Sequence, residues 1–223
     1  LVIGGVTRRF PRLKFAFLEG GVAWGCSLLA ALVGHWEKRN GVAIRDLDPA
    51  TVDRARLMEL FKQYANEKMV SRFAEFDQMM LKGGMGRTAP DETDDFAAAK
   101  ITRKTDIRDL FVPKFFFGCE SDDPTVTYAF ARANPFGAKL GAVLSSDISH
   151  FDVPDMTEVL EEAWELVAEK GLSEEDFHAF SFGNGVKLWA SLNPDFFKGT
   201  VVEREARQYL DQNPPAVESA AAS

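Results

Sequence analysis

Three short apolar runs, each followed by a polar turn, divide the chain. They are LKFAFL at residues 13–18, VPKFFFG at residues 112–118 and LGAVL at residues 140–144. Their apolar residues stand next to one another more often than they alternate with polar ones, which is typical of strands buried on both faces of a sheet. We therefore predict three strands of a parallel sheet that is covered by helices.

Segments with a helical spacing of apolar residues follow the predicted strands. Ser173 with Asp176 resembles a capping box, and Gly171 suits the end of the helix before it. The alternation of strand and helix predicts an α/β fold with right-handed crossovers. The predicted helices cover Val22–Arg39, Pro124–Ala133, Pro154–Lys170, the segment after Ser173, and Asn184–Leu192.

A long polar segment separates the first predicted strand from the second. Residues 50–82 carry apolar side chains at helical spacing, so we predict a helical insertion over about 45–110. Within it, GGMGRTAPDETDD at residues 83–95 predicts a mobile loop. We expect one domain over residues 1–212 and a disordered tail, rich in Ala, Ser and Pro, over residues 213–223.

Composition and charge narrow the functional classes. Apolar residues make up 46% and charged residues 27% of the 223 residues, as in a soluble globular domain. The net charge of -8 argues against a nucleic-acid-binding face, and no apolar run reaches the roughly 18 residues of a membrane span. Cys26 and Cys119 form neither a disulfide framework nor a zinc-ribbon pattern, so we expect two reduced thiols in a cytoplasmic protein.

An acidic residue follows each predicted strand. Glu19, Glu120 and Asp147 end the three runs, and parallel α/β folds bind their ligands at the carboxyl ends of strands. We predict that the three carboxylates surround one site; the alternative is that each serves its own turn or helix cap. Asp147 is the strongest candidate, because a carboxylate there can bind a divalent metal or accept a proton from water. His150 either contacts a ligand or caps a backbone group.

Four segments, in the same order, resemble the metal-dependent amidohydrolases. The closest resemblance is to the branch that contains aminocarboxymuconate-semialdehyde decarboxylase and related aromatic-acid decarboxylases. The segments are RRFPRLKFAFLEGGVAW at 8–24, KFFFGCESDD at 114–123, VLSSDISHFD at 143–152 and GLSEEDFHAFSFGNGVKLW at 171–189. The resemblance implies the C-terminal part of a (β/α)8 TIM barrel, with the predicted strands as its sixth, seventh and eighth. It also implies one or two divalent metals, zinc or alternatively manganese, and a small-molecule substrate.

The resemblance also assigns roles to residues. Asp147 matches the family's aspartate after the eighth strand, which binds the metal or takes a proton from water that the metal activates. Glu19 falls where some relatives carry a histidine that takes part in the chemistry, so it is a second catalytic candidate. Glu120 and His150 match recurrent family positions and are candidates for substrate binding. Trp24 either helps to wall the site or packs into the core.

The sequence departs from the family pattern in two respects. The family's His-x-His pair and a further histidine ligand belong to its first and fifth strands, and the three histidines here show no such arrangement. Ser149 stands where proline is usual. Because three strands cannot close an eight-stranded barrel, we expect either one part of a larger enzyme or a homo-oligomer. Asp147 alone supplies too few ligands to hold a catalytic metal in the isolated chain.

Three functions remain open on these grounds, of which we expect the first. It is metal-dependent hydrolysis of a C–N or C–O bond, with Asp147 as metal ligand and proton acceptor. The second is non-oxidative decarboxylation of an unsaturated or aromatic acid. The third is a non-catalytic interaction module, which the missing His-x-His pair and the open apolar faces of a partial sheet suggest.

Overall fold

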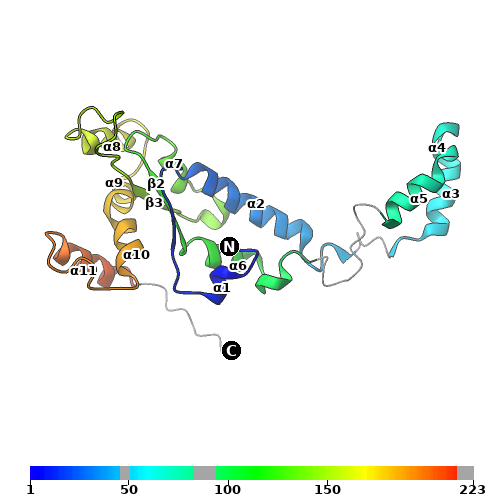
Figure 1. Ribbon diagram of the computed structural model, residues 1–223, viewed down its shortest axis with the longest axis horizontal. Helices are drawn as coiled ribbons and strands as arrows, with labels where there is room; N and C mark the ends of the chain where they lie inside the picture. The colour runs from blue at the N-terminus through cyan, green and yellow to red at the C-terminus, as the bar shows by residue number, and fades with distance from the viewer. Residues whose placement is uncertain (46–50, 83–93, 215–223) are drawn as a thin grey trace. The chain divides into compact units, whose positions relative to one another are not determined.

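The computed structural model describes residues 1–45, 51–82 and 94–214 (Figure 1). Most of the predicted mobile loop at 83–95 and most of the predicted tail therefore lie outside the described residues. The chain divides into two compact units. One contains Leu1–Val33 and the chain from Arg103 onward, and the other is Gly34–Thr102, which begins and ends somewhat earlier than the predicted insertion.

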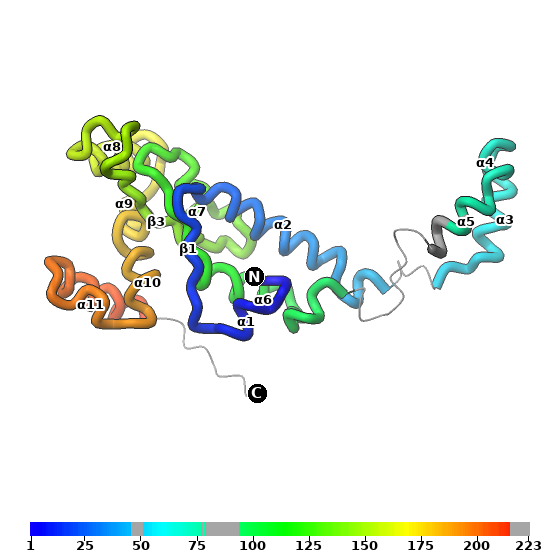
Figure 2. The backbone as a smooth tube through the Cα atoms, in the orientation of Figure 1, coloured from blue at the N-terminus to red at the C-terminus, as the bar shows by residue number. Residues whose placement is uncertain are grey.

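The first unit is built on an open, three-stranded parallel sheet with the order β1-β2-β3. Figure 2 labels β1 and β3, the first and last of these strands. β1 spans Phe15–Phe17, β2 spans Phe115–Cys119 and β3 spans Gly141–Leu144. Phe117 pairs with Phe17 on one side and with Ala142 on the other. The prediction of an α/β fold with three parallel strands is confirmed, and all three carboxyl ends lie at one edge of the sheet.

Helices surround this sheet in the order that the alternating pattern predicts. α1 and α11 are additional helices that the apolar spacing did not indicate. The helices of the first unit are α1 (Val6–Arg9), α2 (Ala23–Arg39, which continues into the second unit), α6 (Lys104–Phe111), α7 (Val126–Ala129), the 3-10 turn η5 (Pro135–Gly137), α8 (Val159–Ala168), α9 (Glu174–His178), the π-helical η6 (Ala179–Gly183), α10 (Asn184–Ala190) and α11 (Glu203–Gln212).

Local side-chain hydrogen bonds decide where two of these helices begin. Ser173 Oγ accepts a hydrogen bond from the backbone N–H of Asp176 at 3.1 Å, which confirms the predicted cap of α9. α8 begins five residues after the predicted start at Pro154. Asp155 accepts hydrogen bonds from the backbone N–H and the hydroxyl of Thr157, at 2.9 and 2.6 Å, and so holds this stretch in a turn.

The phenylalanines of β2 form the centre of the core. Every residue of β2 is buried, and the ring of Phe117 stacks on Phe17 and meets Trp24 edge-on, with centroids 6.0 and 5.1 Å away. Gly25 lets α2 approach this ring, because a Cβ at that position would collide with Phe117. The glycine therefore sets how closely α2 packs on β2.

The helices η6 and α10 pack against β3. The buried Asn184 side chain donates a hydrogen bond from Nδ2 to the backbone carbonyl of Ala142 at 2.8 Å. This bond satisfies a strand carbonyl that would otherwise lie buried without a partner. Val186, Ala190 and Ala206 form a smaller cluster of buried residues, which joins α10 to α11.

Two lysines join the amino ends of β1 and β2. Lys14 Nζ donates a hydrogen bond to the carbonyl of Pro113 at 2.7 Å, and Lys114 Nζ donates one to the carbonyl of Pro11. Lys114 is only 2% exposed. Burial, together with the nearby positive charge of Lys14, lowers the pKa of its amine to about 8.

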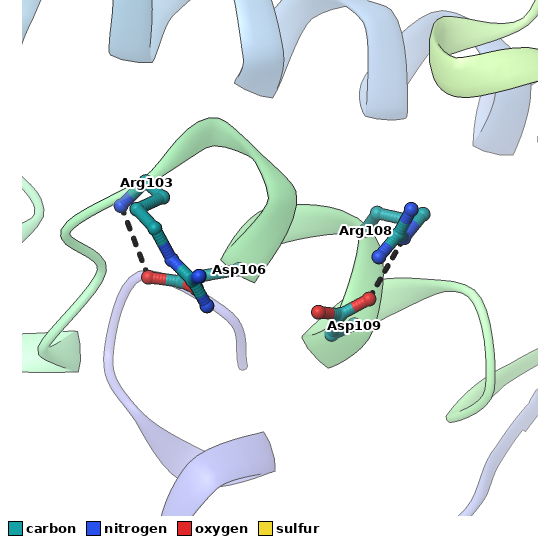
Figure 3. A network of polar contacts seen from close by, with 4 residues as sticks. All are labelled: Arg103, Asp106, Arg108 and Asp109. Atoms are coloured by element: carbon teal, nitrogen blue, oxygen red, sulfur yellow. Dashed lines mark hydrogen bonds and ion pairs between the residues drawn. The ribbon is translucent and has the colours of Figure 1, made fainter. Parts of the chain in front are cut away.

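Ion pairs hold the start of α6, which leads into β2 (Figure 3). Asp106 accepts a hydrogen bond from the backbone N–H of Arg103 and pairs with its guanidinium, both at 3.0 Å. Arg108 pairs with Asp109 at 2.8 Å. The acidic side chains of α6 are thus neutralised by arginines at its start and within it.

The second unit contains the end of α2 and four further elements. α3 spans Arg54–Tyr64, α4 Glu67–Ser71, α5 Phe73–Lys82 and the 3-10 helix η4 Ala97–Ala99. These helices agree with the periodic pattern of residues 50–82. The rings of Phe61, Phe73 and Phe76 pack together with centroids 4.9 to 6.1 Å apart, and they join α3 to α5.

We expect Gly25→Ala to destabilise the protein by about 1–3 kcal/mol, because its Cβ would collide with Phe117 in a packed core. Gly34→Ala, in the same helix, is the matched control, since nothing lies within 4 Å of its added Cβ. This second change should stabilise by about 0.5–1 kcal/mol through helix propensity. Urea unfolding measures both changes, and equal effects would contradict the packing described here.

The lowered pKa of Lys114 predicts a specific pH dependence. Between about pH 8 and pH 10.5 the unfolded chain keeps the proton on this amine while the folded chain loses it. The free energy of unfolding should therefore gain a contribution that rises with pH in this interval. In Lys114→Met that contribution is lost, whereas the exposed Lys170→Met should retain it. Denaturant unfolding across the interval measures the difference, and parallel curves for wild type and Lys114→Met would contradict the assignment.

Candidate functional site

The turn after β3 carries the side chains that are best suited to bind a ligand or to take part in a reaction. The backbone N–H of Ser145 donates to the carbonyl of Cys119 at 2.8 Å, which extends the ladder between β2 and β3 to the start of this turn. Asp147 and Ser149 have φ of 48° and 88°, in the left-handed region. Proline holds φ near about −65° and could not adopt the conformation of Ser149. The serine at this position therefore suits the turn as it is folded.

Asp147, His150 and Asp152 form a compact group in this turn. Asp147 Oδ2 lies 3.0 Å from His150 Nδ1, and the backbone N–H of His150 donates to the Asp147 carbonyl at 3.2 Å. One ligand atom from each of the three side chains lies within 4.8 Å of the other two. The Asp147 side chain is 17% exposed and the His150 side chain 59% exposed, so the group is open to solvent.

An acidic cavity of 470 Å³ lies beside this group. Ser121 Oγ donates a hydrogen bond to Glu162 Oε2 at 2.5 Å, which joins the end of β2 to α8 across the lining. The described lining contains no lysine or arginine. Its carboxylates come from Glu120, Asp122, Asp147, Asp152, Asp155, Glu158, Glu161, Glu162 and Glu165.

Glu120, directly after β2, lies close to several of these carboxylates. Partial desolvation raises the pKa of its carboxyl group, and the carboxylates of Asp122, Asp147 and Asp152 raise it further. Glu120 and Asp147 thus line one cavity, as their positions at neighbouring strand ends suggest. An extra positive charge in the cavity would relieve the repulsion among these groups.

Glu19 and Trp24 lie differently from the other candidates. Glu19 is exposed, has φ of 61°, and is not among the residues that line the acidic cavity. Trp24 is 39% exposed, and its ring meets Phe17 and Phe117 edge-on. The sequence left core packing open as one role for Trp24, and these ring contacts give it that role. The structure does not bring either residue to the group around Asp147.

The chemistry of the compact group suits a divalent cation. Two carboxylates and an imidazole are ligands that zinc and manganese both accept. Two ligands about 2.1 Å from one tetrahedral ion lie about 3.4 Å apart. The ligand atoms, spread over as much as 4.8 Å, must therefore approach one another by up to about 1.4 Å, which rotamer changes of the exposed His150 and Asp152 side chains supply. Asp147, His150 and Asp152 would hold such an ion.

Asp152 and the glutamates of α8 are the functional candidates that sequence reasoning missed. The spacing of Asp152 from Asp147 and His150 in DISHFD was the available signal. The other two histidines have partners elsewhere. His35 Nε2 lies 3.0 Å from Asp95 Oδ2, and the His178 ring packs near Phe182 and Tyr209.

Comparisons with known proteins give no match to a family model, to a curated protein or to a solved structure. In the part of the chain that the structure describes, no helix has both the length and the apolar composition of a membrane span. The local geometry and charge of the site are therefore the basis for a functional proposal.

The raised pKa of Glu120 predicts how stability depends on pH. The folded chain keeps this proton to a higher pH than the unfolded chain, so wild type should lose stability relative to Glu120→Gln as the pH rises from acidic to neutral. Added salt should reduce the difference by screening the neighbouring carboxylates. Thermal unfolding of both proteins, with Glu174→Gln outside the cavity as the control, measures it. A difference that is constant with pH would contradict the assignment.

Proposed function

We propose that this chain acts in a metal-dependent hydrolase of the amidohydrolase type, with its cation held by Asp147, His150 and Asp152. The observation that carries the proposal is the convergence of these three ligand groups at the carboxyl end of a parallel sheet. This is where α/β folds place their active sites. The order of the four segments that resemble the family supports the same conclusion.

We propose further that β1, β2 and β3 correspond to the sixth, seventh and eighth strands of a (β/α)8 barrel. Their parallel direction, their sequential order and the helix after each strand support this equivalence. On this proposal, Gly34–Thr102 corresponds to an extended connection between the sixth and seventh strands. A loop that directly follows a strand lies at the carboxyl face of a barrel. The segment Gly34–Thr102 does not follow β1 directly, because α2 stands between them in the chain.

The charge of the cavity favours hydrolysis over decarboxylation. A decarboxylase of this type must bind a substrate carboxylate, yet the carboxylates of the described lining include Glu120, Asp122 and Glu162 without a lysine or arginine. An anionic substrate would be repelled by this lining, whereas a neutral or cationic amide or ester would not. We therefore propose a neutral or cationic substrate.

The residues of the group take distinct roles in this proposal. A bound divalent cation supplies Lewis acidity to activate water or to polarise a substrate carbonyl. Asp147 Oδ2 lies 3.0 Å from His150 Nδ1, so each side chain limits the orientation of the other before an ion binds. Glu120 holds its proton more readily than an ordinary glutamate, which suits a group that donates a proton to a leaving group.

Cation binding tests the proposal directly. We expect isothermal titration of the full chain with Zn²⁺ or Mn²⁺ to show one site, and Asp147→Asn or His150→Gln to weaken it by about tenfold or more. His178→Gln, outside the group, is the matched control and should bind normally. Affinity should fall as the pH is lowered, because Glu120 then takes up its proton and no longer attracts the cation.

Turnover separates the three functions. A neutral ester such as nitrophenyl acetate should be hydrolysed by the cation-loaded chain but not by the Asp147→Asn variant. A hydroxybenzoate, tested as a substrate for decarboxylation, should release no carbon dioxide. Cation binding without turnover of either substrate would favour the non-catalytic module. A chain that binds neither Zn²⁺ nor Mn²⁺ would overturn the proposal.

A further inference from the structure

We call the exposed apolar side chains of the loop after β3 and of the outer side of α8 the apolar strip; within it, the Trp164 ring also packs edge-on against Phe177, with centroids 5.0 Å apart. Phe151 is 98% exposed, and Leu160 and Trp164, four residues apart on α8, are 63% and 43% exposed. Residues four apart lie on the same side of a helix, and the buried face of α8 is a different one, made by Val159, Ala163 and Leu166. Ile148 and Met156, at 48% and 52% exposure, add to this strip. Several large apolar side chains exposed within residues 148–164 make this part of the surface a candidate interaction site.

Acidic side chains border the strip and define what can cover it. Glu161 lies one turn before Trp164 and one turn before Glu165, so both glutamates stand beside the apolar side chains on the exposed part of α8. Residues 145–169 contain no lysine or arginine. An occupant must therefore combine apolar side chains with positive charge.

The chain itself carries a segment of that composition. RRFPRLK, at residues 8–14, exposes Phe10 by 53% and Leu13 by 46%, with Arg9 and Arg12 exposed beside them. The chain has no acidic residue before Glu19. The nearby acidic side chains of α6, Asp106 and Asp109, are already in ion pairs with arginines (Figure 3). Arg9 and Arg12 therefore present positive charge next to Phe10 and Leu13.

The basic segment and the apolar strip lie at opposite ends of the strands of the same sheet. Residues 8–14 precede β1 and lie at its amino end, whereas α8 follows β3 and lies beyond its carboxyl end. The five residues of β2 alone separate these ends by about 16 Å, at roughly 3.3 Å per residue. One chain therefore cannot bring its own basic segment onto its own apolar strip, but a second copy can.

We propose that copies of this chain associate head to tail, with residues 8–14 of one copy seated on the strip of Phe151, Leu160 and Trp164 of the next. Such a contact is heterologous, so it builds open chains or closed rings and not a two-fold symmetric dimer. The contact goes beyond the proposed hydrolase and requires no bound cation. It also places a neighbour's segment beside Glu161 and Glu165, which line the acidic cavity.

Sedimentation of the full chain with a chelator present tests the proposal. The weight-average mass should rise with protein concentration and fall with added salt, because screening weakens the charged rim. Arg9→Glu with Arg12→Glu, and separately Glu161→Arg with Glu165→Arg, should each weaken association by about a hundredfold, since each places like charges in contact. Circular dichroism confirms that these surface variants remain folded.

Mixing the two charge-reversed proteins is the decisive measurement. In each reversed protein the segment and the strip carry charge of the same sign, so its copies repel one another. In the mixture, the unchanged segment of one protein meets the unchanged strip of the other, and the two reversed surfaces carry opposite charges. Association should therefore return. Leu160→Ser should weaken association about tenfold, whereas Val201→Ser, at an exposed position away from the strip, should not. A monomeric wild type, association unaffected by the reversals, or no recovery on mixing would each overturn the proposal. A result of any of these kinds leaves the cation-binding experiment unaffected.

Discussion

The parallel pairing of β2 with both of its neighbours is the constraint on which the rest of the first unit depends. Phe117 sits at the centre, in register with Phe17 on one side and Ala142 on the other, and its ring is closed in by α2. Because all three strands point the same way, the residues that follow them emerge at one edge. The parallel direction of β2 and β3 is therefore enough to bring Glu120 and Asp147 to one cavity.

The same strand direction separates charge along the sheet. Cations gather at the amino ends of the strands, where Lys14 and Lys114 bind carbonyls. Carboxylates gather at the carboxyl ends, where α8 and its N-cap residue Glu158 add four glutamates. Desolvation, together with the neighbouring carboxylates, raises the pKa of Glu120, and a cavity so rich in carboxylates favours cationic occupants. The proposed cation site and the proposed association between copies both depend on this one charge arrangement.

The proposed chemistry depends on a small local structure. The backbone of Asp147 and Ser149 adopts left-handed conformations, and this turn brings His150 and Asp152 back toward the Asp147 carboxylate. Backbone strain of this kind persists where surrounding contacts enforce it, and it is common at functional sites. The three proposed ligands come from one loop, so their grouping does not depend on residues from other strands of a barrel.

The sequence by itself determined the strands and their parallel arrangement, and it made Asp147 the leading candidate, because apolar runs and strand-end acids are local signals. It also identified the cap of α9 from Ser173 and Asp176. Only the tertiary structure decided that Asp152 joins Asp147 and His150, that Glu19 stays outside the cavity, and that Trp24 packs on Phe17 and Phe117. The reason is physical: hydrophobic periodicity reports which face of an element is buried, whereas the direction of a side chain after a strand depends on the backbone angles of the turn that carries it.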